Sequence, residues 1–484
     1  MCGLLAVRSK LHSKQFNIES LNLMSHRGPD ATVCWQLSDV FVGQTIQNFS
    51  GNIDSYQDNH GFVFNGEIYN WQELGGQIND TALVKDFVQN KSYSELEKLV
   101  GPWAWINVYQ DALEFATDPQ YEKHLFYYQD SDLQIVCSEI APILRYVCPN
   151  IQLQTFSTKH YPIVDSTPFA GIRKAQPGLL YRDCVPVFEL DSIYNWCYNS
   201  THTHTQAVEE LDRLLEQQIA SMVPKEPYSL SYSGGLDSSL LQTYLPSAET
   251  VTIATSKDIL SQTISTDQRL FLDEKIWAEY FVELSSKLQL PMLSWSLVGW
   301  YAVTKNQNNR ILFNGNGADE LFAGYKNYLQ DQTRSPYSDN SCANTELKKH
   351  IERLNLSNSL NGLNLLDYTV MCGCVDVLGI DLVGGFNSVE VRSPFIDKHI
   401  IGFALSLKQS SKIGRNTKLV LRDLYRARTG KEYTEPKSGF VGHCNDSIPY
   451  INNKYSYSDL DRYTEWRQFI LDYFSDISNK HTTT

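Results

Sequence analysis

The sequence lacks any apolar run near the ~20 residues that a membrane-spanning helix needs, and its start lacks the charged segment, apolar core and cleavage site of a secretion signal. Basic residues are outnumbered, 41 against 55 acidic ones, and no long basic run occurs, which argues against a nucleic-acid or anionic-membrane surface. The ten cysteines are dispersed over 484 residues, as is typical of reduced thiols. We therefore expect a cytoplasmic protein that binds small molecules.

One cysteine stands apart because it directly follows the initiator methionine. If Met1 is removed, Cys2 carries a thiol and a free α-amine, and an α-amine titrates near ~8. A nucleophile and its general base then share one residue, which is the N-terminal nucleophile arrangement. The alternative is a small apolar cysteine at the start of a buried strand.

The length suggests two or three domains, and the pattern changes along the chain. Up to about residue 189, short apolar or alternating runs broken by turn residues predict an α/β domain with antiparallel sheets. Helices are expected at 80–89 and 94–100, and a polar linker at 194–205. The predicted strands are 3–8, 32–36, 61–64, 103–109, 113–116, 125–128 and 134–137, with a turn and strand at 171–180.

After the linker, predicted strands alternate with predicted helices. Such alternation favours a doubly wound parallel sheet, and the chain from residue 321 onward is largely helical in pattern. The expected helices are 207–222, one from 240 onward, and 275–288, and the expected strands are 228–232, 250–255 and 311–313.

The segment Ser233-Gly234-Gly235-Leu236-Asp237-Ser238-Ser239 lies between a predicted strand and a predicted helix. Its glycines allow close approach of the backbone to a ligand, while serine hydroxyls and the free N–H groups of a helix start form an anion site. The Asp237 carboxylate can hold Mg²⁺ against phosphate oxygens. The glycine-lysine pair of the kinase-type phosphate loop is absent.

This loop resembles the pyrophosphatase loop of enzymes that adenylate a substrate with ATP. With four further strings, in order and over most of the chain, it resembles glutamine-hydrolysing asparagine synthetase. The strings are His26-Arg27-Gly28-Pro29-Asp30, Asn65-Gly66-Glu67-Ile68-Tyr69-Asn70, Asn314-Gly315-Asn316-Gly317-Ala318-Asp319-Glu320-Leu321-Phe322-Ala323-Gly324-Tyr325 and Glu390-Val391-Arg392-Ser393-Pro394-Phe395-Ile396-Asp397.

The resemblance implies an α/β fold in two domains. Residues 1–190 would form a class II glutamine amidotransferase domain, an αββα N-terminal-nucleophile sandwich. Residues 191–205 would be a linker, and 206–484 a doubly wound parallel-sheet ATP-pyrophosphatase domain with a helical C-terminal part. Members often pair, which implies a homodimer.

The resemblance also implies roles for residues of the first domain. Cys2 would attack the side-chain amide of glutamine, and its own amine would relay protons. Asn65 and the Gly66 backbone N–H match the family's oxyanion hole, whose donors stabilise the tetrahedral intermediate. Asn65, Gly66, Glu67 and Asp80 match glutamine-binding positions, and the carboxylate of Asp80 suits an ammonium group.

In the second domain, ammonia would meet an acyl-adenylate formed from ATP and a carboxylate. Asp237 and Asp319 are the implied Mg²⁺ ligands, and Lys437 matches a lysine that neutralises the charge developing on pyrophosphate. Lys418 and Arg422 match family residues near the site, with a solvated helix face as the alternative. The implied ATP-binding residues are Tyr232, Ser233, Gly234, Gly235, Asp237, Ser238, Ser239, Ile253, Asn314 and Gly315.

The chain departs from the family at several places. Residues 42–49 contain no arginine, where the family has one that clamps the glutamine carboxylate. Asn316 stands where the family has a glutamate tied to acyl-adenylate formation, and asparagine has no ionisable group. No string matches the family's aspartate-binding Thr-Ile-Arg, and the aromatic segment 295–301 either shapes a different acceptor pocket or is helix core.

Three functions follow. The first is a glutamine-dependent asparagine synthetase that converts ATP, aspartate and glutamine to asparagine, glutamate, AMP and pyrophosphate. The second is a related ligase that amidates or cyclises a different carboxylate, as β-lactam synthetases and peptide-cyclising homologues do. The third is a non-catalytic regulator that binds glutamine or ATP.

Overall fold

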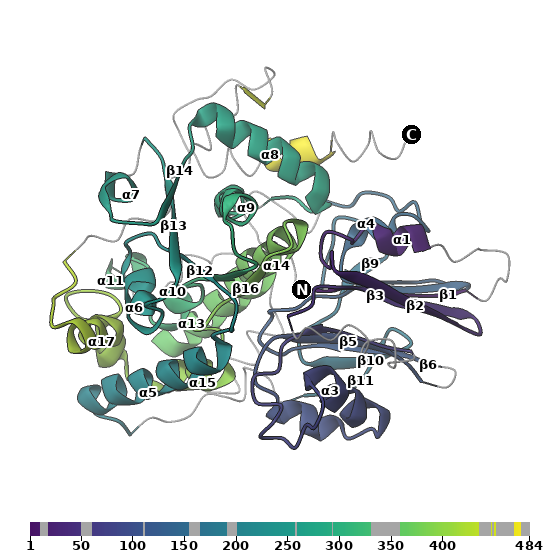
Figure 1. Ribbon diagram of the computed structural model, residues 1–484, viewed down its shortest axis with the longest axis horizontal. Coiled ribbons are helices and arrows are strands. Elements are labelled where there is room, and N and C mark those ends of the chain that lie inside the picture. The colour runs from purple at the N-terminus through teal and green to yellow at the C-terminus, as the bar shows by residue number, and fades with distance from the viewer. Residues whose placement is uncertain are drawn as a thin grey trace.

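The computed structural model describes residues 1–9, 18–49, 61–109, 112–153, 165–190, 201–256, 259–292, 294–330, 359–434, 447, 450–451 and 469–475. Two halves pack side by side, and the N-terminus lies between them (Figure 1). Within these residues, no helix is long and apolar enough to cross a membrane.

The N-terminal half contains two antiparallel sheets, as the alternating apolar pattern predicts. Its strands are β1 (Gly3–Ser9), β2 (Ala31–Leu37), β3 (Val40–Ile46), β4 (Phe62–Gly66), β5 (Trp103–Tyr109), β6 (Ala112–Thr117), β7 (Phe126–Gln129), β8 (Leu133–Cys137), β9 (Ile172–Lys174), β10 (Leu179–Arg182) and β11 (Val185–Glu189). One sheet has the order β2-β3-β1-β8-β7-β9 and the other β11-β10-β6-β5-β4. Strand β1 thus lies inside its sheet, which fixes the chain start at the core.

Helices cover the outer faces of the two sheets (Figure 1). Helices α1 (Ile18–Asn22) and α4 (Ile140–Ile143) pack on the first sheet. Helix α3 (Asp80–Gln89) and the 3₁₀ helix Tyr93–Lys98 cover the second, with Val84 and Val88 in one apolar cluster with Trp105. The inner faces of the two sheets share a further apolar cluster, so the αββα order is confirmed.

The C-terminal half is built on a parallel sheet of order β14-β13-β12-β15-β16, with strands β12 (Ser229–Ser231), β13 (Glu249–Ala254), β14 (Gln268–Phe271), β15 (Ile311–Phe313) and β16 (Glu390–Arg392). Its helices are α5 (His204–Met222), α6 (Leu236–Tyr244), α7 (Ile259–Thr263), α8 (Glu274–Leu288), α9 (Ser296–Asn306), α10 (Ala318–Leu321), α11 (Asn327–Gln330), α13 (Leu360–Asp367), the π-helical segment Tyr368–Asp376, α14 (Val377–Phe386), α15 (Lys398–Ser406), α16 (Gln409–Lys412) and α17 (Leu419–Thr429).

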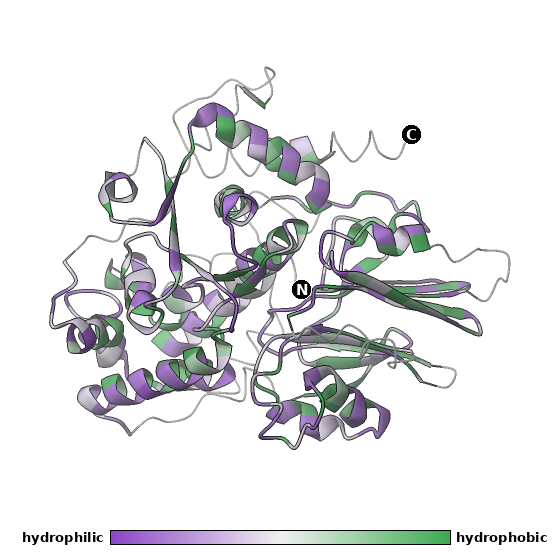
Figure 2. Cartoon of the chain, viewed as in Figure 1, coloured by the Kyte–Doolittle hydropathy of each residue, from purple (hydrophilic) through white to green (hydrophobic). Residues whose placement is uncertain are grey.

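Helices lie on both faces of this sheet, so the doubly wound prediction is confirmed (Figure 1). Successive side chains of a strand point to opposite faces. Ile311 and Phe313 of β15 accordingly join the apolar cluster of α5, α6 and α17, while Leu312 joins that of α8, α9 and α14. Figure 2 shows the hydrophobic colour concentrated along the strands and on α14.

Several predicted boundaries were wrong. Residues 94–100 were expected to be an α-helix, but 93–98 form a 3₁₀ helix. The linker predicted to reach residue 205 ends earlier, because Thr203 caps α5 by accepting from the Gln206 N–H and His204 is already helical. Strands β3, β11, β14 and β16 were not predicted.

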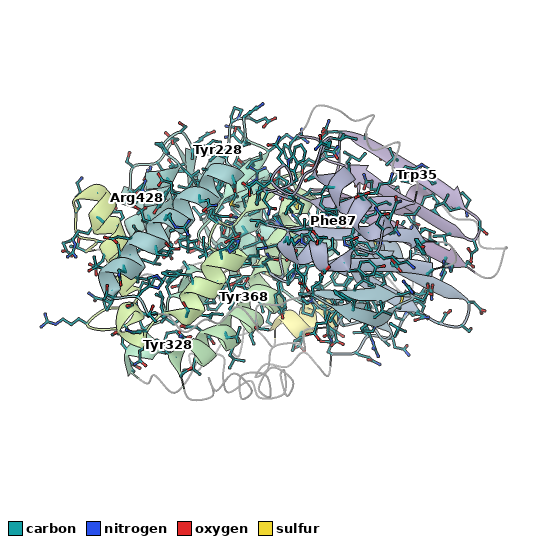
Figure 3. The ribbon with its side chains drawn as sticks, turned by 90° about the horizontal axis from the view of Figure 1, so that it is seen from below. Trp35, Phe87, Tyr228, Tyr328, Tyr368 and Arg428 are labelled. Atoms are coloured by element: carbon teal, nitrogen blue, oxygen red, sulfur yellow. The ribbon has the colours of Figure 1, made fainter. Side chains whose placement is uncertain are left out.

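Polar contacts join the two halves beside the apolar ones. Tyr368, labelled in Figure 3, donates its hydroxyl to the carbonyl of Gln120 at 2.8 Å. Arg392 of β16 binds the Glu67 carboxylate at 2.6 Å. The predicted glutamine-binding segment is therefore held against the second half at Glu67.

Candidate active sites

The first site lies at the start of β1, where the predicted nucleophile is buried between the two sheets. The backbone N–H of Cys2 donates to Asn65 Oδ1 at 2.8 Å. Burial raises the pKa of the Cys2 thiol, so the thiol form predominates and a neighbouring base is needed to generate the thiolate nucleophile.

Asn65, at the end of β4, presents a donor beside Cys2. Its side chain is fully buried, and its Nδ2 group has no hydrogen-bond partner among the residues that the structure describes. A buried donor without a partner destabilises a folded protein, and a bound ligand can supply the missing acceptor. Gly66 follows directly, and a Cβ there would lie 2.2 Å from the Pro102 carbonyl oxygen, so only glycine fits.

Asp80 begins α3 and is tied to the same loop. Its carboxylate accepts from the Ile68 N–H at 3.1 Å and from the Thr81 N–H at 2.6 Å, although burial raises its pKa. The predicted glutamine-binding residues thus lie on one segment, 65–80, with Asn65 beside Cys2 and Asp80 bound to the backbone of Ile68.

A buried ionic network surrounds the chain start and spans both halves. Arg27 donates to the Cys2 carbonyl at 3.1 Å and to Asp381 of α14 at 2.9 Å. Lys123 binds Asp381 at 3.2 Å and Glu390 of β16 at 3.0 Å. Burial opposes ionisation of Asp381 and Glu390, but these cations outweigh it and hold the pKa of both carboxyls below the usual range.

The α-ammonium group of Met1 belongs to the same network. It donates to Gln47 Oε1 at 2.5 Å and pairs with Glu390 at 2.7 Å. Gln47 in turn donates to the Ser388 carbonyl at 2.6 Å, which fixes its amide orientation. With Met1 in place, Cys2 has an amide nitrogen and no basic amine.

The second site is a cavity of about 350 Å³ at the carboxyl ends of β12, β13 and β15. Ligands of open α/β sheets bind at this edge. Helix α9 contributes residues at i, i+3, i+4 and i+7, which lie on one helix face. The lining residues comprise Ser231, Tyr232, Ser233, Gly235, Leu236, Asp237, Ser238, Val251, Ile253, Ser261, Ser296, Gly299, Trp300, Val303, Gly315, Asn316, Asp319, Asp376, Thr417, Lys418, Arg422 and Tyr433.

Most predicted ATP-binding residues line this cavity, and three do not. Gly234 and Ser239 belong to the loop but not to the cavity wall, and Tyr433 donates to the Gly234 carbonyl at 2.9 Å. Asn314 is fully buried behind the wall, where its Oδ1 accepts from the Asn316 N–H at 2.8 Å. Lys437 lies outside the described residues.

Lys418 lies between the two predicted metal ligands. Its Nζ is 2.6 Å and 2.7 Å from the carboxylate oxygens of Asp237 and 2.7 Å from Asp319 Oδ1. Burial would lower the pKa of Lys418, but the two carboxylates raise it above its usual value. The structure therefore brings together three residues that the sequence singled out separately.

Two residues of the cavity wall, Asp376 and Trp300, were missed or left open by the sequence analysis. Asp376 ends the π-helical segment beside Ser296, and burial raises its pKa to about 6. No local motif marks it. Trp300 lines the cavity, while Tyr301 is buried in the core, so the segment 295–301 contributes both to the cavity wall and to the helix core.

A second, small cavity of about 20 Å³ lies between the two sites. Met1 and Lys123 line it from the N-terminal half, and Asn316 and Val377 from the other half. A water molecule needs roughly 10–15 Å³ by this measure, so the cavity holds one molecule of that size. Asn316 lines both cavities, and its Nδ2 has no partner within the described part of the chain.

Comparisons with known proteins agree with this two-part arrangement. Residues 210–453 match the asparagine synthase family, and residues 1–184 match a glutamine amidotransferase domain. The chain is 24% identical over 393 residues to asparagine synthetase (glutamine-hydrolyzing) 1 of Bacillus subtilis, covering 70% of this chain and 61% of that protein.

Two further relatives have slightly lower sequence identity to the chain. A probable asparagine synthetase (glutamine-hydrolyzing) of Dictyostelium discoideum is 22% identical over 507 residues, covering 90% of this chain and 83% of that protein. Amidase chry2 of Gibberella zeae is 23% identical over 383 residues, covering 66% and 56%. The match thus spans less than two thirds of the Bacillus and Gibberella proteins.

Proposed function

The chain belongs to the asparagine synthase family, and from this we propose that it is a glutamine-dependent, ATP-consuming ligase that converts a carboxylate to an amide. The observation that carries the proposal is the position of Asn316. It lines the large cavity beside the loop 233–238 and also the small cavity that reaches Met1. The cavity beside the chain start and the proposed adenylation cavity therefore share a wall residue.

At the first site, removal of Met1 frees the Cys2 amine, which takes the thiol proton. The thiolate attacks the side-chain carbonyl carbon of glutamine, and Asn65 Nδ2 donates to the oxyanion. The C–N bond breaks as the amine returns the proton, so ammonia leaves and a thioester stays on Cys2. Water then hydrolyses the thioester to glutamate. Glu67 and Asp80 hold the amino-acid end of the substrate.

At the second site, ATP binds along the loop 233–238, with Ile253 beside the base. A carboxylate oxygen of the acceptor attacks the α-phosphorus, and pyrophosphate leaves. Ammonia then attacks the acyl carbon, AMP leaves, and the amide forms. Lys437 would neutralise the charge on pyrophosphate.

A divalent cation fits the carboxylates in this cavity. Asp237 and Asp319 both bind one cationic group, Lys418, so their oxygens converge. Oxygen donors together with phosphate oxygens suit Mg²⁺. When bound, the ion would neutralise charge on the phosphates, and Asp237 and Asp319 are the residues that would hold it.

Aspartate is the proposed acceptor, with asparagine as the product. A specific observation favours a second candidate, a ligase for another carboxylate. Asp376 and Trp300 line the cavity wall, and Asn316 supplies an amide where a glutamate is expected. An anionic and an aromatic side chain suit an acceptor that carries an amine or an apolar group more readily than they suit a second carboxylate.

The test is pyrophosphate release by the purified protein, measured with glutamine, with ammonium, and with neither, over a panel of carboxylates headed by aspartate. Turnover with aspartate and either nitrogen source supports the first candidate. Release with another acceptor and no nitrogen source favours the second. Silence with every acceptor, in a protein that binds ATP, overturns the proposed activity and favours a binding role.

A further inference from the structure

The ion pair between Lys418 and two carboxylates has a feature that nucleotide binding alone does not explain. Lys418 is 4% exposed, whereas the carboxylates of Asp237 and Asp319 are 22% and 29% exposed. Its ammonium group occupies both oxygens of Asp237 and one of Asp319. These are the oxygens that a divalent cation would use.

The local backbone is shaped to let these groups meet. Lys418 has a φ of 56°, in the left-handed region that only glycine adopts without strain. A Cβ on Gly324 would lie 1.8 Å from Asp319 Oδ1 and 2.3 Å from Lys418 Cε. Because any larger residue there would separate Lys418 from Asp319, the contact depends on glycine at this position.

A lysine and a divalent cation exclude each other at such a site. Mg²⁺ binds carboxylate oxygens at ~2.1 Å, so an ion on the same oxygens would lie within a few ångströms of the ammonium group. Repulsion between the ion and the ammonium group at that distance is strong in a partly buried site, where solvent screens charges less than in bulk water. Lys418 must therefore leave before the ion enters, and a buried lysine needs a new anionic partner.

We propose that Lys418 is a positioning residue that occupies the divalent-cation seat of Asp237 and Asp319 while the cavity is empty. Nucleotide phosphates draw the ammonium group away, and the cation then enters the vacated seat. The protein consequently binds divalent cation and nucleotide together and discriminates against the cation alone. This inference rests on the proposed nucleotide role of the cavity.

Binding of Mn²⁺ to the protein without nucleotide, followed by electron paramagnetic resonance of free Mn²⁺, tests the proposal. The wild-type protein should bind weakly, and Lys418→Met should bind at least ~10-fold more tightly because the carboxylates lose their resident cation. Asp319→Asn in the Lys418→Met background should return binding to the weak level. Equal affinity of wild type and Lys418→Met overturns the proposal.

Arg422→Met is the matched control. Arg422 lines the same cavity, and its guanidinium donates to the carbonyls of Thr417 and Tyr433. Arg422→Met removes the same charge as Lys418→Met but leaves Lys418 on the two carboxylates. The Mn²⁺ affinity of this variant should therefore stay near the wild-type value. A gain as large as that of Lys418→Met would show a general charge effect and overturn the specific role of Lys418.

Thermal melting of the wild-type protein gives a measurement that requires no variant to fold. Mn²⁺ alone should leave the Tm unchanged, and Mn²⁺ with a non-hydrolysable ATP analogue should raise it beyond the analogue alone. A rise with Mn²⁺ alone as large as with both overturns the proposal. Neither measurement needs turnover, so silence in the pyrophosphate assay would overturn the proposed activity and leave the role of Lys418 standing.

Discussion

Two asparagines, one in each half, present the same group in different surroundings. The Nδ2 atoms of Asn65 and Asn316 are both buried and without a partner among the described residues. Asn65 lies in a sealed site, beside a chain start that ion pairs from both halves surround. Asn316 lies in the wall of an open cavity. Asn65 therefore acts beside the chain start within one half, whereas Asn316 lies where the large cavity adjoins the interface of the two halves.

The largest expected effect separates the two sites completely. Cys2→Ala removes the proposed nucleophile, so glutamine-driven turnover should fall by at least ~10³-fold. Ammonium-driven turnover should survive, because the large cavity is built without Cys2. Both rates are measured as amide formed. Cys34→Ala, which changes an exposed cysteine, is the control. Loss of both rates in folded Cys2→Ala would contradict the division into two sites.

Acid should weaken the sealed site more than the open one. The pKa values of the Asp381 and Glu390 carboxyls lie below their usual range, so both groups stabilise the fold fully above about pH 4.5 and lose this contribution as the pH falls. Lys123→Met breaks a buried pair and should cost about 3–5 kcal/mol at pH 7. The Tm gap between wild type and variant should narrow from pH 6 to pH 3.

An exposed pair provides the comparison for that experiment. Lys98 binds Glu95 at 2.8 Å with 58% of its side chain exposed, and surface pairs contribute roughly 0–1 kcal/mol. Lys98→Met should therefore change the Tm little at any pH. If the Tm difference between wild type and Lys123→Met instead grows as the pH falls, the buried carboxylates do not stabilise the interface.

Asn65→Asp tests the donor of the sealed site alone. Aspartate keeps the oxygen that accepts from the Cys2 N–H and removes the Nδ2 donor. Loss of one oxyanion donor typically lowers kcat by about 10²–10³-fold, and we expect this for glutamine hydrolysis, with ammonium-driven turnover unchanged. An unchanged kcat for glutaminase activity would show that Asn65 does not donate to the oxyanion.

The sequence predicted most strands of both halves but not the contacts between residues that are distant along the chain. Alternating apolar runs located most strands of both halves, whereas β3 was missed because Gly43, Gln44 and Thr45 interrupt its apolar pattern. Pairing with β1 and β2 on its two sides, rather than local propensity, makes it a strand. Tertiary pairing overrode the local pattern there.

Contacts between distant residues had no signal in the spacing. Arg27 and Asp381 are 354 positions apart, and nothing local indicates that they meet. Lys418 matched a family position near the site, but its place between Asp237 and Asp319 emerges only once α6, α10 and α17 are packed. Asp376 lies in no motif, so only the cavity reveals it.

Of the substitutions that test turnover, Asn316→Asp is expected to change the rate least. It gives the most direct comparison with Asn65→Asp. The change removes the same Nδ2 donor and adds a carboxylate at the wall that both cavities share. If Asn316 stabilises the acyl oxygen during amide formation, kcat should fall about 10²-fold. Glutamine-driven and ammonium-driven turnover should fall together, whereas Asn65→Asp lowers only the first. Glutaminase activity without ATP should stay unchanged, because Cys2 and Asn65 are untouched. A fall in the glutamine-driven rate alone would place Asn316 on the ammonia route rather than at the acyl carbon.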